Sequence, residues 1–201
     1  MEYRLDKHEL LEHMRVWNSF LKRKVHLIAC GGTAMTLFDV KPSTRDVDFM
    51  VPTIVEYDYL IKQLKALGYT SVSGSGWQHP KDAFHFDIFR GNHIHTTELL
   101  ESPLEDGRHT TLIELSRVYI GVLNDYDLIT SKLMRGTRVD FDDCAMLVRA
   151  HIEIINFKKL TDGFDKMLKY NTVGEDRIRH NFDSFMTQMA EEGLHGQPKA
   201  T

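Results

Sequence analysis

The sequence predicts an α+β fold, in which a mixed β-sheet flanked by helices is followed by a C-terminal helical subdomain. Up to about residue 123, short apolar segments that end at glycine or proline alternate with helical patterns, as strands and helices do around a sheet. Beyond that residue the apolar positions recur at helical spacing. We therefore expect an α/β core with an N-terminal helix over residues 1–123, a helical subdomain over 124–192 and a flexible tail over 193–201.

The individual elements follow from capping residues, apolar periodicity and breakers. The first helix begins at a capping-box pattern, Asp6 with Glu9, and a second such pattern, Thr53 with Glu56, opens a later helix. The expected strands are 25–30, 46–51, 84–89, 93–99 and 117–123, with 69–73 as a further candidate. The expected helices after the first are 33–38, 53–67, 125–135, 140–152, 157–170 and 173–191.

Composition excludes several classes of protein. Apolar residues make up 42% and charged residues 27% of the 201, which is ordinary for a chain that buries a core without disulfides or metals. The net charge of −4 argues against a protein that coats DNA. No apolar run approaches the ~18 residues of a membrane span, and no basic-then-apolar leader opens the chain, so we expect a cytoplasmic protein. Cys30 and Cys144, each beside an apolar segment, are expected to be buried free thiols.

The first candidate site residues form a glycine turn. Gly31, Gly32 and Thr33 stand between the first predicted strand and a short helix. Glycines let a backbone approach a ligand closely, and the start of a helix offers N–H groups to an anion such as phosphate. A plain tight turn explains the same residues without any ligand, so the motif has little weight alone.

Two carboxylates follow on the next predicted strand. In Asp46-Val47-Asp48 the two aspartates are two residues apart, and such residues share a face of a strand. Carboxylates this close repel each other unless a cation lies between them, and Mg²⁺ or Mn²⁺ prefers carboxylate oxygens. The alternative is a strand terminus at which Asp46 caps a loop and Asp48 is solvated.

A third acid lies in an aromatic strand. Asp87 is flanked by Phe86 and Ile88, and it shares a face with His85. A lone acid among aromatic residues is costly to bury, which points to a site, although an edge strand with one solvent-exposed face would have the same pattern. We expect the five histidines of the segment 79–109 to be scattered on the surface, because no helical pair of Cys or His completes a zinc site.

Together, the three motifs resemble the nucleotidyltransferase superfamily of the polymerase-β type. Its pattern is a Gly-Gly motif, a D-x-D metal pair about a dozen residues later and a distal third carboxylate, which correspond here to Gly31-Gly32-Thr33, Asp46-Val47-Asp48 and Asp87. Within the superfamily, the sequence is most similar to the small bacterial branch of AbiEii-like toxins and related uncharacterised nucleotidyltransferases. The resemblance covers about residues 25–150 and implies a nucleotidyltransferase-like fold.

The same branch has further basic and acidic residues. A basic, hydroxyl-rich run precedes its acids, as Lys41 to Arg45 does here. A helical segment after its sheet contains Lys followed by Arg and Asp, which resembles Lys132 and the segment 138–143. Lys132 lies on or beside the apolar stripe of its predicted helix, where a lysine either extends to solvent or points into a cleft. With a nucleotide site nearby, a triphosphate contact is the favoured interpretation.

The resemblance implies a metal-dependent transfer of an NMP from an NTP, such as ATP, to a hydroxyl acceptor. Asp46, Asp48 and Asp87 would be catalytic residues that bind Mg²⁺ or Mn²⁺. The implied nucleotide-binding residues are Gly31, Gly32, Thr33, Lys41, Arg45 and Lys132. The expected acceptor is the 3′ end of an RNA, tRNA above all, and next a protein hydroxyl. The toxin-like branch also implies a cognate antitoxin and a role in a toxin–antitoxin or phage-defence pair.

Two other functions would use the same residues. The main alternative is a catalytically silent protein of this fold that acts as a binding or regulatory module, although a silent copy need not keep all three aspartates. A metal-dependent nuclease could use the same carboxylates, but it gives no reason for the glycine turn.

Overall fold

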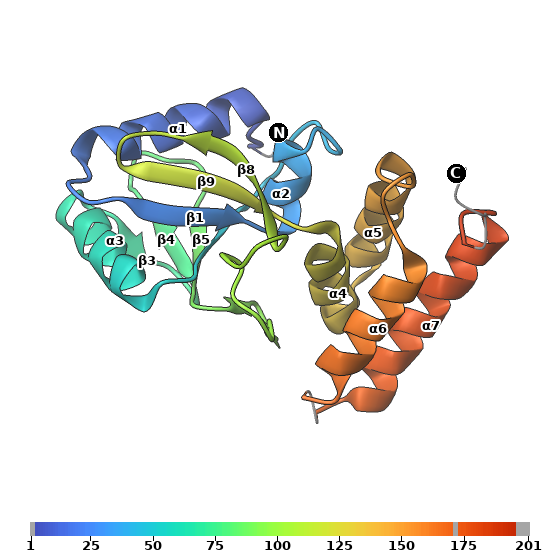
Figure 1. The fold of residues 1–201 in the computed structure, drawn as a ribbon. Coiled ribbons are helices and arrows are strands. Elements are labelled where there is room, and N and C mark those ends of the chain that lie inside the picture. Colours follow the sequence, from blue (N-terminus) through green and yellow to red (C-terminus); the bar gives the residue numbers. More distant parts are fainter. Residues whose placement is uncertain (1–2, 171–172, 196–201) are drawn as a thin grey trace. The chain divides into compact units, whose positions relative to one another are not determined.

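In the computed structural model, residues 3–170 and 173–195 are described, and they form two compact units. The first unit ends at Asn124 and the second begins at Asp125; the division expected from the sequence lies after residue 123. The first unit contains a sheet with its helices, and the second is helical (Figure 1).

A seven-stranded sheet forms the centre of the first unit. In spatial order its strands are β3 (Thr70–Ser71), β4 (Gly76–Gln78), β5 (Phe86–Arg90), β2 (Val47–Val51), β1 (Val25–Ala29), β9 (Val118–Leu123) and β8 (His109–Glu114). Strand β1 runs parallel to β9 and antiparallel to β2, and β2 runs parallel to β5. The sheet is therefore mixed, as predicted.

Strand β5 is an interior strand of this sheet. It pairs with β2 on one side and with β4 on the other, so the edge-strand interpretation of the Asp87 segment is wrong. The edges are β3, which has two residues, and β8, whose register shifts between Thr111 and Ile113. At the centre, every residue of β2 is buried.

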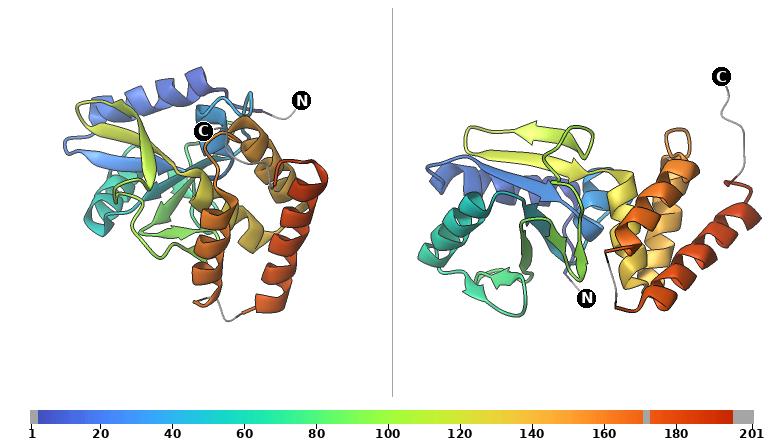
Figure 2. Two further views of the ribbon diagram at one scale, coloured as in Figure 1. Left: turned by 45° about the vertical axis from the view of Figure 1, so that its right-hand side comes forward. Right: turned by 60° about the horizontal axis from the view of Figure 1, so that its bottom comes forward.

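Helices α1 and α3 cover opposite faces of the sheet (Figures 1 and 2). Helix α1 (Lys7–Phe20) packs Trp17 against Phe86 of β5, with ring centroids 4.6 Å apart. Helix α3 (Ile54–Ala66) reaches the other face, where the Glu56 carboxylate lies 3.0 Å from His26 Nδ1 on β1.

This contact explains why one predicted cap is wrong. Thr53 stands at the N-terminus of α3 but makes no side-chain capping bond. The Glu56 carboxylate, which a capping box would turn back to Thr53, instead accepts a hydrogen bond from the backbone N–H of His26 at 2.8 Å. A contact with a strand distant in sequence has replaced the local one.

The strands also differ in detail from the sequence pattern. The segment 93–99 is a hairpin of β6 (His93–Ile94) and β7 (Thr97–Glu98), which turns at His95 with a φ of 50°. Left-handed φ is uncommon for a residue other than glycine, and it lets two short strands replace the single strand that the pattern indicates. Strands β4 and β8 have no counterpart among the predicted elements.

Four helices form the second unit, as the fold prediction requires: α4 (Asp125–Arg135), α5 (Arg138–Ala150), α6 (Phe157–Leu168) and α7 (Glu175–Glu191). Their apolar stripes build one core, in which the rings of Phe164 and Phe182 stack with centroids 4.0 Å apart. Of the predicted tail, residues 193–195 are described and 196–201 lie outside the described residues.

Both cysteines are buried free thiols, as predicted. Burial raises the pKa of the Cys144 thiol, so this group stays protonated and is a poor nucleophile. None of the helices in residues 3–170 and 173–195 has the length and apolar composition that a bilayer span requires.

The caps of α1 and α3 give a matched test of local stabilisation. The Asp6 carboxylate accepts the Glu9 N–H at 2.9 Å, whereas Thr53 makes no such bond. We expect Asp6→Ala to lower the free energy of unfolding by about 1 kcal/mol and Thr53→Ala to change it little. Urea unfolding followed by circular dichroism measures both, and equal losses would contradict the capping assignment.

Candidate functional site

Two of the three predicted carboxylates meet on neighbouring strands. Asp48 on β2 and Asp87 on β5 are direct partners in the parallel register, so their Cα atoms lie about 4.8 Å apart. Partners in register project to the same face of a sheet. This face is opposite to the one on which Phe86 contacts Trp17. The fold therefore places two negative charges side by side.

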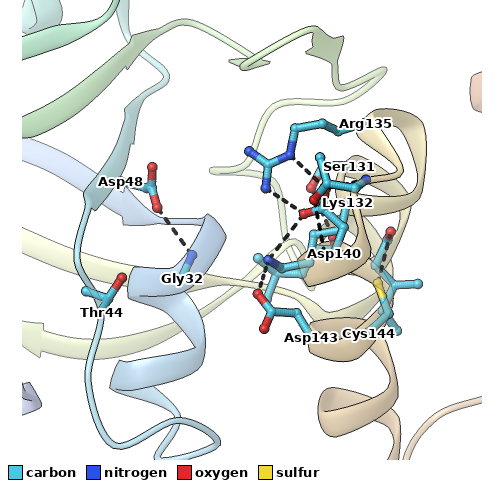
Figure 3. A network of polar contacts seen from close by, with 12 residues as sticks. Gly32, Thr44, Asp48, Ser131, Lys132, Arg135, Asp140, Asp143 and Cys144 are labelled. Atoms are coloured by element: carbon cyan, nitrogen blue, oxygen red, sulfur yellow. Dashed lines mark hydrogen bonds and ion pairs between the residues drawn. The ribbon is translucent and has the colours of Figure 1, made fainter.

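Asp48 is buried, with 5% of its surface exposed, so the alternative of a solvated strand end is wrong. Its Oδ2 accepts a hydrogen bond from the backbone N–H of Gly32 at 3.2 Å (Figure 3). Its Oδ1 lies 3.9 Å from Nε2 of His95, the residue at the turn of the β6–β7 hairpin. The His95 ring rests edge-on against Phe89, with centroids 4.8 Å apart.

The glycine turn lies directly against this carboxylate, at the start of α2 (Gly31–Leu37). Gly31 has a φ of 54°, and a Cβ added to it would lie 2.4 Å from Asp48 Oδ2. A Cβ on Gly32 would lie 2.6 Å from Thr44 Oγ1. Because real Cβ contacts are never this short, both positions require glycine for the approach of Asp48 and Thr44.

Thr33 fixes the start of β2 from within the fold. Its side chain is fully buried, and its hydroxyl accepts the Asp48 N–H at 2.8 Å and donates to the Asp46 carbonyl oxygen at 3.2 Å. The Thr44 hydroxyl donates to the same Asp46 oxygen at 2.9 Å. The Thr33 hydroxyl thus positions the aspartate segment, and any phosphate contact of this residue would be made by its backbone.

Asp46 does not join the pair. It lies in the bend before β2 and is exposed. Across the described residues, no group of three or more His, Cys, Asp or Glu side chains is arranged to hold a metal ion. Lys41 and Arg45 belong to the same loop, with Arg45 exposed and Lys41 partly buried. The predicted metal role of Asp46 and the predicted nucleotide contacts of Lys41 and Arg45 stay predictions.

Asp87 has two polar neighbours that sequence reasoning did not assign to the site. Ser75 Oγ donates to Oδ1 at 2.9 Å, and Nε2 of His85 lies 3.4 Å from Oδ2. With His95 beside Asp48, two of the five histidines expected to be scattered therefore flank the carboxylate pair. The one signal for them was the shared face of His85 and Asp87; Ser75 lies in the turn between β3 and β4, outside every predicted element.

The donor chemistry of this pair fits a divalent cation. Mg²⁺ prefers carboxylate oxygens, and it is commonly held by one or two carboxylates together with water and substrate phosphates. Asp48 and Asp87 supply two such carboxylates in register on a rigid sheet. A cation site of this kind would need no third protein ligand, so the exposed position of Asp46 is compatible with it.

Lys132 lies in the second unit, on α4, and does not extend to solvent. Its side chain is 4% exposed, and Nζ donates to Asp143 Oδ2 at 2.7 Å and lies 3.9 Å from Asp140 Oδ1 (Figure 3). Asp143, a residue of the segment that resembles the AbiEii-like branch, is thus its buried partner. The prediction of a phosphate contact for Lys132 stays a prediction.

Asp140 is held by a second cation. Arg135 donates to both of its oxygens, at 2.9 and 2.5 Å, and the Thr137 hydroxyl and N–H donate to Oδ2. Burial alone would raise the pKa of Asp140, but the hydrogen bonds from Arg135 and Thr137 outweigh it and lower the pKa. The carboxylate therefore stabilises the unit above the unfolded pKa of about 3.9, and this stability is lost as the pH falls through the lower folded value.

Gly32 and Thr44 can be tested as a pair. We expect Gly32→Ala to destabilise the protein by about 1–3 kcal/mol, because its Cβ would displace the Thr44 hydroxyl. With Thr44→Ala in the same chain the next contact is Thr44 Cβ at 3.6 Å, an ordinary distance, so the two losses should not add. Urea unfolding of the two single variants and the double variant measures this coupling; fully additive losses would contradict the described packing.

The Lys132–Asp143 pair gives a second test. Lys132→Met leaves a buried carboxylate without its cation, and we expect a loss of about 3–5 kcal/mol in unfolding free energy. Adding Asp143→Leu should recover much of that loss, because an apolar pair replaces the ion pair. Both are measured by thermal and urea unfolding without nucleotide. A Lys132→Met variant as stable as the parent would argue against a structural pair and leave nucleotide binding as the role of Lys132.

No family model and no curated protein matches the sequence. Among solved structures, an antigenic nucleotidyltransferase-like protein from Paracoccidioides brasiliensis is 14% identical, with a TM-score of 0.54 over 98% of this chain and 97% of that chain. A proposed nucleotidyltransferase from Thermotoga maritima is 16% identical, with a TM-score of 0.45 over 70% of this chain and 92% of that chain. At such identity the first likeness bears on the fold alone, and the AbiEii-like branch stays a prediction. The chain has a nucleotidyltransferase-like fold, as the sequence predicts.

Proposed function

We propose that the protein is a metal-dependent nucleotidyltransferase, which moves an NMP from an NTP to a hydroxyl acceptor. One observation carries the proposal: Asp48 and Asp87 stand in register on adjacent parallel strands, with the backbone of Gly31 and Gly32 packed against Asp48. Two of the three carboxylates that the resemblance implies, together with its glycine turn, therefore lie close together on a nucleotidyltransferase-like fold, which supports the proposal.

The reaction itself is a phosphoryl displacement. An acceptor oxygen forms a bond to the α-phosphorus, the bond from that phosphorus to its bridging oxygen breaks, and pyrophosphate leaves. A bound divalent cation supplies charge neutralisation and makes the acceptor hydroxyl more acidic. Asp48 and Asp87 would hold that cation through their carboxylate oxygens, with Asp46 added from the adjoining bend. Asp87 would also take up the proton of the acceptor hydroxyl.

The residues proposed to bind the triphosphate differ in how well the contacts support them. Gly31, Gly32 and Thr33 would border it through their backbone, because the Thr33 hydroxyl is used inside the fold. Lys41 and Arg45 precede Asp46 in the same loop and would supply positive charge there. For Lys132, the buried pair with Asp143 supports a structural role more strongly than a phosphate contact.

The resemblance to AbiEii-like proteins supports an RNA 3′ end as the acceptor, with tRNA favoured and a protein hydroxyl next. On the same ground we propose that the protein works in the cytoplasm as the toxin of a toxin–antitoxin or phage-defence pair, with an antitoxin as its partner. The competing function is a silent module that binds nucleotide and transfers nothing.

Asp87→Asn separates these two functions. The amide keeps the shape of the side chain and can still accept from Ser75, so we expect NTP with Mg²⁺ to raise the melting temperature almost as in the parent. Transfer should fall by orders of magnitude, because an amide neither takes up the acceptor proton nor neutralises the cation. Differential scanning fluorimetry measures nucleotide binding, and the transfer of α-³²P label from each NTP to total RNA measures the reaction.

The matched control is Asp106→Asn, a change of the same kind at an exposed loop residue, which should match the parent in both assays. Undiminished transfer by Asp87→Asn would remove Asp87 from the mechanism. If the parent protein binds NTP but labels neither RNA, protein nor small acceptors, the silent module replaces the enzyme.

A further inference from the structure

We propose that Ser75 is a self-modification site, at which the protein attaches an NMP to its own hydroxyl group. The inference rests on the proposed function, because it uses the same carboxylates and the same NTP. It deepens that function by naming an acceptor within the chain.

The hydroxyl group of Ser75 is hydrogen-bonded to Asp87, the carboxylate that would take up the proton of an acceptor. Its Oγ donates to Asp87 Oδ1 at 2.9 Å, and Asp87 stands beside Asp48 on the next strand. A hydroxyl that reacts with the α-phosphorus must lie within hydrogen-bond reach of the group that takes its proton. Ser75 meets this condition without any movement of the backbone.

The backbone around Ser75 holds the hydroxyl in this position. The Ser75 carbonyl oxygen accepts the N–H of Ile88 on β5 at 2.9 Å, which ties the turn to the strand that contains Asp87. The turn itself is closed by a hydrogen bond from the Gly76 N–H to the Ser73 carbonyl oxygen at 2.7 Å. A near-fixed geometry of this kind lowers the entropic cost of reaction.

Ser75 lies between two glycines, Gly74 and Gly76, of which one is exposed and the other is packed in the sheet. Gly76 is the register partner of Asp87 on β4, and a Cβ there would lie 2.8 Å from Val72 Cγ2 and 2.9 Å from the Ser73 carbonyl oxygen. Gly74, on the other side, is exposed, and a Cβ placed on it would meet nothing within 4 Å. Ser75 is partly exposed, so the turn is anchored by the sheet and open toward solvent.

The step is balanced with NTP as the one co-reactant. Ser75 Oγ forms a bond to the α-phosphorus, the bond from that phosphorus to its bridging oxygen breaks, and pyrophosphate departs. The serine proton passes to the Asp87 carboxylate and from there to water. The product is a phosphodiester that joins Ser75 to the 5′ position of a nucleoside. It removes the hydroxyl from Asp87 and fills the acceptor position, so self-modification would end further transfer by the same molecule.

Intact-mass and peptide mass spectrometry test the proposal. The full-length protein is incubated with Mg²⁺ and each NTP in turn, without any other acceptor, and is then digested. We expect the intact mass to increase by one NMP and the adduct to map to Ser75. Ser73→Ala, which removes the exposed serine two residues away, should be modified as the parent is, whereas Ser75→Ala and Asp87→Asn should lose the adduct. The same peptide mapping of protein purified from cells, without added NTP, shows whether Ser75 is already modified independently of the incubation.

The outcomes separate the two proposals. Transfer to RNA or another acceptor without any adduct on Ser75 overturns self-modification and leaves the proposed function standing. An adduct on a different residue, or one that persists in Ser75→Ala, overturns it as well. If neither Ser75 nor any external acceptor is labelled while NTP still raises the melting temperature, both proposals fail together. If NTP still raises the melting temperature of Ser75→Ala, the variant binds nucleotide, and its lack of an adduct is due to the missing hydroxyl and not to lost binding.

Discussion

Two carboxylates in register on adjacent strands are the constraint on which the rest of the first unit depends. Like charges opposite each other destabilise a sheet, and burial adds to the cost. Neighbouring segments supply hydrogen-bond donors and imidazole groups around them, from Gly32, His95, Ser75 and His85. Two of these contacts depend on left-handed backbone: Gly31 has a φ of 54° and a Cβ on it would lie 2.4 Å from Asp48 Oδ2, and the hairpin that brings His95 to Asp48 turns at a φ of 50°. The close approach of the glycine turn thus depends on Asp48, and an external cation would stabilise two carboxylates that lie this close together.

In the second unit, buried acids are paired with basic side chains. Asp143 is neutralised by Lys132 and Asp140 by Arg135, so each acid has a cation from a neighbouring position of the same helical unit. Such pairs cost desolvation and hold specific helices together, and removing one partner is more damaging than removing both. Asp87, by contrast, has a hydroxyl and an imidazole as its partners. The difference in partner chemistry separates acids that serve the fold from an acid suited to a ligand.

The sequence could predict the parts of this site that depend on local rules. Gly31 and Gly32 are visible as a glycine turn, Asp48 as an acid in an apolar strand, and the second, helical unit follows from periodicity, whereas Asp46, two residues before Asp48, lies apart from the site. The resemblance leads one to expect Asp48 and Asp87 in one site. The strand register that makes them direct neighbours, however, joins residues 39 positions apart in the sequence, which no local pattern predicts.

Other parts depend on contacts that no local pattern contains. The Glu56 carboxylate binds His26 and leaves Thr53 without a capping box, because a strand N–H competes for the same oxygen. His95 reaches Asp48 through a hairpin that turns at a left-handed residue.

The two edge strands of the sheet also affect how the folded protein associates with other copies. A two-residue strand at one edge and a bulged strand at the other offer no long, straight row of free N–H and C=O groups, so the architecture itself discourages edge-to-edge association and the growth of fibres from the folded state.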